Sequence, residues 1–72
     1  MIEIKNYWID DTPTIKDVEE AFELVRNNDI VVKLNWHFPW SGTYNRVVTK
    51  DTLERHTPES YFEDVIPHCY GV

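Results

Sequence analysis

The chain has 72 residues, which suits one domain over residues 1–72, and it carries 13 acidic against seven basic side chains for a formal net charge of −6. This excess of acid excludes direct binding to nucleic acid or to an anionic membrane surface, since both need clustered Lys and Arg, and it favours a basic protein partner. A single cysteine excludes a disulfide-stapled secreted fold, and no apolar run approaches a membrane span or a signal peptide, so we expect a cytoplasmic protein.

The first two predicted elements are a strand and a helix. Residues 2–9 alternate in polarity, which predicts a strand with one solvated face and with Ile4 directed at the core. The helix is predicted over residues 14–27, with Thr14 as N-cap and Asp17 three residues later. Its apolar residues recur along one stripe: Ile15, Val18, Ala21, Phe22 and Val25.

A hairpin is predicted next. Residues 30–37 alternate and are rich in β-branched side chains, with Leu34 and Trp36 on the core face. Residues 38–42 contain a Pro and a Gly, which is typical of a hairpin loop. Residues 43–49 then return as a second alternating strand.

The C-terminal third completes the predicted fold. Lys50 starts a short turn that ends near His56, and a last helix begins with Thr57 as N-cap and Pro58 at its first position and ends at Pro67. The order β-α-β-β-α predicts an α+β domain whose three-stranded sheet carries helices packed on one face. The predicted core consists of Ile4, Val18, Phe22, Val32, Leu34, Val48, Phe62 and Val65.

Candidate metal ligands and nucleophiles are present without the spacing of a known site. His37, His56, His68 and Cys69 form no Cys-x-x-Cys, His-x-x-x-His or His-Glu-x-x-His pair, and adjacent residues rarely face one ion. Only two glycines are present, which is too few for a phosphate-cradling loop. We therefore expect no catalytic residue, no bound metal and no cofactor.

The segment 36–44 is the most specific feature of the sequence, because it brings four aromatic rings, a histidine and a proline to the predicted hairpin tip. Phe38 and Trp40 cannot both be buried under a short loop. An exposed Trp beside a rigid Pro is typical of a protein-interface anchor. The alternative is that these rings pack on each other. The predicted binding residues here are Trp40, Phe38, His37 and Tyr44.

A second predicted surface is acidic. From Asp51 onward the chain carries five acids and one base, Arg55. Such a one-sided field suits docking to a basic partner, although a solvated acidic face is the alternative. Glu59 and Glu63 on the last helix are added to the predicted binding residues on this ground.

These patterns predict a non-catalytic interaction or regulatory module that binds another protein, with a homodimer covering part of the aromatic surface. Small acidic chains of this kind are often accessory or phage-type gene products, which is an association of size and charge. The alternative hypothesis is a small oligomeric ligand-binding domain or enzyme, with a pocket lined by Trp36, Trp40, Tyr44 and a histidine.

Overall fold

The computed structural model describes residues 3–39 and 42–66 of the chain. Six elements follow one another in these residues: β1 (Glu3–Trp8), α1 (Ile15–Asn27), β2 (Ile30–Phe38), β3 (Gly42–Val48), α2 (Lys50–Arg55) and α3 (Pro58–Asp64). The predicted α+β class is confirmed. The predicted turn after Lys50 is a six-residue helix, α2.

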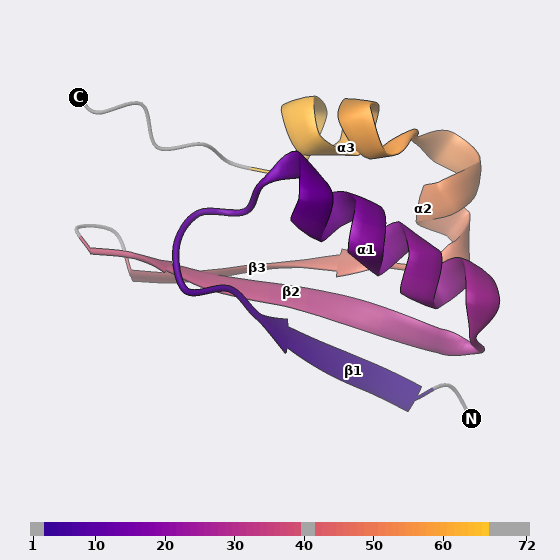
Figure 1. The fold of residues 1–72 in the computed structure, drawn as a ribbon, viewed down its shortest axis with the longest axis horizontal. Helices are drawn as coiled ribbons and strands as arrows, with labels where there is room; N and C mark the ends of the chain where they lie inside the picture. The colour runs from indigo at the N-terminus through magenta and orange to yellow at the C-terminus, as the bar shows by residue number, and fades with distance from the viewer. Residues whose placement is uncertain (1–2, 40–41, 67–72) are drawn as a thin grey trace.

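The three strands form one mixed sheet in the order β1-β2-β3. β1 runs parallel to β2, and β2 runs antiparallel to β3. Parallel neighbours need a crossover connection, which α1 supplies, whereas β2 and β3 are joined directly as the predicted hairpin. Figure 1 shows the three helices over the same face of the sheet. The other face carries no helix of the described chain.

The helix starts follow from local capping chemistry. The Thr14 side chain accepts from the Asp17 N–H at 3.4 Å, and the Asp17 carboxylate accepts from the Thr14 N–H at 2.8 Å. Together they form the capping box that begins α1. Thr57 caps α3 in the same position, with Pro58 in its first turn, as predicted.

The core lies between the sheet and the helices. Four of the five residues of the predicted stripe on α1 are at most 2% exposed, and the fifth, Ile15, is half-buried. The four are Val18, Ala21, Phe22 and Val25. The sheet and α3 contribute Val32, Leu34, Trp36, Phe38, Val48, Tyr61 and, just after α3, Ile66. The predicted core residues Phe62 and Val65 pack against this cluster while half-buried.

The prediction that Ile4 faces the core is wrong, because its side chain is 61% exposed. The register places Lys5 beside Val32 and Ile4 beside Val31. Residues opposite each other on paired strands share a face of the sheet, so the odd-numbered residues of β1 lie on the side of buried Val32. Tyr7 lies on that side too and reaches α1, which leaves Ile4 on the face without helices.

Candidate functional site

The sheet face without helices is the candidate functional surface, and we call it the open face. Strand alternation and register define its members. They are Ile4, Asn6 and Trp8 on β1, Val31, Lys33, Asn35 and His37 on β2, and Thr43, Asn45 and Val47 on β3.

Exposed apolar side chains gather on the open face. Trp8 is 69% exposed, Ile4 61% and Val47 43%, and these are the exposed large hydrophobic residues of the described chain. Single apolar residues scattered over a surface need no explanation. All three instead lie on one face of one sheet, with Asn6 between Ile4 and Trp8 and Lys33 between Asn6 and Val47. An uncovered sheet face with exposed apolar residues is a candidate surface for contact with another molecule.

A polar strip crosses the middle of the open face. Asn35 is only 4% exposed although it lies on the uncovered side of the sheet. Its Nδ2 donates to Asn6 Oδ1 at 3.3 Å and to the Lys33 carbonyl at 3.0 Å. These bonds satisfy the buried Asn35 Nδ2 and orient the exposed Asn6 amide, which lies between Ile4 and Trp8, so a binding partner would meet the Asn6 amide already oriented.

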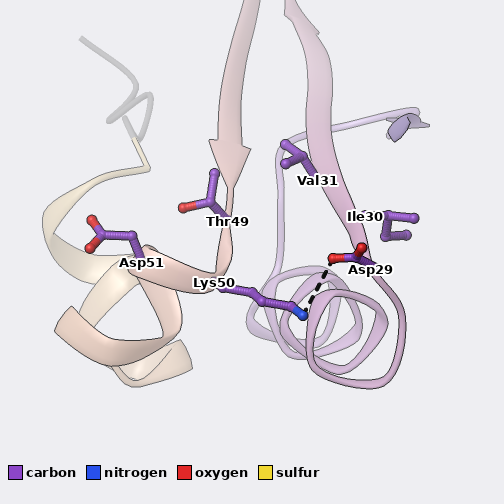
Figure 2. Close-up of a pocket in the computed structure, with 6 residues that line it drawn as sticks. All are labelled: Asp29, Ile30, Val31, Thr49, Lys50 and Asp51. Carbon is purple, nitrogen blue, oxygen red and sulfur yellow. Dashed lines mark ion pairs between the residues drawn. The ribbon is translucent and has the colours of Figure 1, made fainter. Parts of the chain in front are cut away.

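A pocket of about 250 Å³ lies where β2 begins and β3 passes into α2, as Figure 2 shows. It is lined by Asp29, Ile30, Val31, Thr49, Lys50 and Asp51. Lys50 Nζ lies 3.5 Å from Asp29 Oδ1 and joins the two walls. The volume is below the roughly 300–1,000 Å³ of small-molecule sites, so the pocket suits a single side chain better. Ile4 pairs with Val31, which lines the pocket from β2.

The aromatic residues of the hairpin pack mainly on one another. Trp36 is 1% exposed, which confirms its predicted place on the core face. Its ring stacks on Tyr44 at 6.3 Å and 17°, and the Phe38 ring meets Tyr44 edge-on at 5.0 Å. Phe38 is itself 4% exposed. Trp36 and Phe38 therefore offer almost no surface to a ligand or a partner.

The structure separates the other predicted binding residues. His37 is exposed on the open face, with its Nδ1 3.5 Å from Thr43 Oγ1. Glu59 and Glu63 are exposed on α3, on the helical side. Trp40 lies outside the described residues.

The described residues contain neither a metal-binding cluster nor a membrane-spanning helix. Among residues 3–39 and 42–66, no three His, Cys, Asp or Glu side chains gather in a group that could hold a metal ion. His68 and Cys69 lie outside these ranges. No helix of the described residues is long and apolar enough to cross a membrane.

Trp8 is the residue of the open face that sequence reasoning missed. The signal was the period of two in residues 2–9, which puts Trp8 on the same face as Ile4. An assignment of Ile4 to the core therefore also assigns Trp8 to the core. Because the sequence analysis assigned the wrong face of β1 to the core, it did not predict that Trp8, the largest exposed ring of the described chain, lies on the surface.

Tyr7 fastens β1 to α1 on the opposite side of the sheet. Its hydroxyl donates to Glu20 Oε2 at 3.0 Å and to Asp17 Oδ1 at 3.4 Å. The hydrogen bond to Glu20 raises the pKa of Tyr7 to about 12, and burial and the two carboxylate charges act in the same direction.

A second phenol, Tyr61 of α3, is also shifted. Burial raises the pKa of Tyr61 to about 12, against the opposing effect of the Arg46 charge.

We expect the free energy of unfolding to fall as the pH rises from 10 to about 12. Both phenols have pKa values raised from 10.0 in the folded protein, so their contribution is complete below pH 10 and is lost towards pH 12. Urea unfolding at successive pH values measures this loss. Absorbance at 295 nm should show late-ionising phenols that the Tyr7→Phe/Tyr61→Phe double variant lacks. Ionisation of both phenols near pH 10 in the folded wild type would contradict the assignment.

Comparison with protein-family models, with curated proteins and with solved structures finds no match to this chain. The fold and the surface define it as a small α+β domain with one helix-covered and one open sheet face. Function is therefore inferred from the open face itself.

Proposed function

We propose that this chain is a non-catalytic module that binds another protein through the open face of its sheet. The observation that carries the proposal is Trp8, whose ring is 69% exposed. Trp dominates the energetics of protein interfaces, because it offers a large contact area with few rotatable bonds. Ile4 and Val47 extend the apolar surface on the same face, at 61% and 43% exposure.

The proposed partner presents an apolar side chain and carries basic groups. The pocket beside Val31, about 250 Å³ in volume, has room for one apolar side chain. At the pocket Asp29 is paired with Lys50 and Asp51 with Arg55, whereas the chain as a whole has a net charge of −6. Such a field attracts a basic partner and raises the rate of encounter more than the final affinity.

The residues predicted from the sequence have different parts in this proposal. His37 belongs to the open face and contributes directly. Trp40 is proposed as a further contact residue because it directly follows the exposed Pro39 in the sequence. Glu59 and Glu63 lie on the helical side and would steer a basic partner rather than contact it through the open face. A single cysteine leaves the chain no internal disulfide, and we expect binding to take place in the cytoplasm.

The test is Trp8→Ala. An immobilised full chain captures partners from a lysate of its native cells, and the captured protein is then titrated by calorimetry. We expect the variant to bind at least about thirtyfold more weakly, which corresponds to about 2 kcal/mol. Its fold should persist, since an exposed side chain contributes little to the core.

The matched control is Glu19→Ala, an exposed position on α1 at the helical side. It should bind like the wild type. Equal affinity of Trp8→Ala and wild type for the captured protein, with both chains folded by circular dichroism, would rule out the open face as the binding surface.

A further inference from the structure

The outer edge of β1 presents free backbone groups. The Ile9 N–H donates to the Asn35 carbonyl at 2.9 Å, so the backbone groups of odd-numbered residues in β1 point at β2. Those of Ile4, Asn6 and Trp8 consequently point away from the sheet. No hydrogen bond among the described residues uses them. An open edge of this kind is a template for another strand.

The opposite edge of the sheet is blocked by side chains. The Val47 carbonyl accepts from the Tyr61 hydroxyl at 3.1 Å, and the Asn45 carbonyl accepts from Arg46 Nη1 at 2.7 Å. Arg46 Nε also donates to the Val65 carbonyl at 3.2 Å, which ties the end of α3 to β3. In Figure 1, β1 lies at the edge of the sheet away from α2 and α3. Strand addition is therefore favoured at β1.

A second copy of the chain matches this edge in one register. A two-fold axis perpendicular to the sheet at Asn6 pairs Asn6 with Asn6 of the second copy. It also pairs Ile4 of each copy with Trp8 of the other. The three residues with outward backbone groups are then all paired, and each such pair exchanges two hydrogen bonds. An axis at Ile4 leaves Trp8 without a partner in β1. An axis at Lys5 opposes two ammonium groups, which is unfavourable.

The side chains on both faces agree with the Asn6 register. On the open face, Ile4 and Trp8 are the two most exposed large hydrophobic residues, and each would contact the other across the new strand pair. On the helical side, Lys5 would lie opposite Tyr7 of the second copy. The hydroxyl of Tyr7 is held by Glu20 and Asp17, so a cation approaches an acidic cluster. Apolar pairing and charge complementarity thus select the same arrangement.

We propose that β1 pairs antiparallel with β1 of a second copy, giving a two-fold dimer with a continuous six-stranded sheet. This proposal goes beyond the proposed function, because it concerns the edge of the sheet and a copy of the same chain. The dimer would join two open faces into one. A short edge-to-edge interface is typical of weak association, and we expect a dissociation constant on the order of 10 µM.

Sedimentation velocity of the full chain, from about 1 µM to about 500 µM, should show a shift from monomer to dimer around that constant. Asn6→Pro removes an outward N–H that the ladder to β2 does not use, and edge strands tolerate proline. Ile4→Glu places a charge beside Trp8 of the second copy. We expect each variant to weaken dimerisation at least about tenfold while remaining folded by circular dichroism.

Val47→Glu is the matched control, since it adds the same charge to the same face on β3. It should leave the dimer unchanged and weaken binding of the proposed protein partner, so either proposal can fail without the other. Monomer at every concentration would overturn the dimer. Loss of the dimer in Val47→Glu to the same extent as in Ile4→Glu would overturn edge pairing in favour of face-to-face stacking.

Cross-linking tests the register. In a Cys69→Ser chain, Asn6→Cys places two cysteines opposite each other with Cα atoms about 5.5 Å apart, within disulfide range. Ile4→Cys and Lys5→Cys are the controls, because a two-fold axis at either residue would place its cysteine opposite the same cysteine of the second copy. Mild oxidation should give a covalent dimer most readily with Asn6→Cys. Preferential cross-linking of either control, or of none of the three, would overturn the Asn6-centred pairing.

Discussion

Phe22→Ala is expected to unfold most of the protein at 25 °C. Phe22 is 2% exposed in the middle of the buried stripe of α1, and its ring meets Tyr61 of α3 edge-on at 5.7 Å and 66°. Truncating a buried Phe to Ala costs about 3–5 kcal/mol, because it removes apolar contact and leaves a cavity. A single core of this size rarely supplies more than about 3–5 kcal/mol in total. The loss therefore approaches the whole free energy of folding.

Urea unfolding followed by far-ultraviolet circular dichroism measures the effect. The control is Leu24→Ala, on the same helix but half-buried, which should cost only about 1 kcal/mol. A cooperative transition of Phe22→Ala with a midpoint near that of the wild type would show that Phe22 does not join α1 to α3.

The elements that the sequence predicted well are those with local signals. Thr14 and Asp17 close a capping box within four residues, and the apolar stripe of α1 has helical period, so neither depends on distant parts of the chain. The hairpin is similar, since its strands alternate on both sides of a short loop. Gly42 has φ 95°, a left-handed conformation that favours glycine and fits the predicted turn.

The face of β1 depended on a contact that no local pattern reveals. Ile4 is more apolar than Tyr7, so hydropathy alone assigns Ile4 to the core. The actual face is the one from which Tyr7 reaches Glu20 of α1, thirteen residues away. A phenol can lie on a helix-covered face because its ring is apolar and its hydroxyl finds a partner at the rim.

The candidate site was hard to predict for a related reason. Its pocket is made from two short segments, 29–31 and 49–51, that come together only when β2 and the end of β3 lie side by side. Neither segment carries a motif of its own. α2 was also missed as a helix, because its capping box pairs Thr49 with Thr52 in place of the usual acid or amide.

The second large effect is expected at Trp36, where the alanine and phenylalanine variants should differ sharply. Trp36 has the largest fully buried side chain of the described chain, at 1% exposure, so Trp36→Ala should cost about 3–5 kcal/mol. Trp36→Phe also loses apolar volume. It removes, however, the Nε1–H, which is buried and finds no acceptor among the described residues.

A buried donor without an acceptor costs about 1–3 kcal/mol, so its removal offsets part of the cavity that Trp36→Phe creates. We expect Trp36→Phe to cost less than about 1.5 kcal/mol and to keep the stacking partner of Tyr44. Urea unfolding followed by circular dichroism compares the three chains without relying on indole fluorescence. If the phenylalanine variant is as unstable as the alanine variant, Nε1–H makes a polar contact that stabilises the fold. That outcome would also favour the alternative hypothesis of a ligand pocket lined by Trp36, since the indole would then have a polar partner.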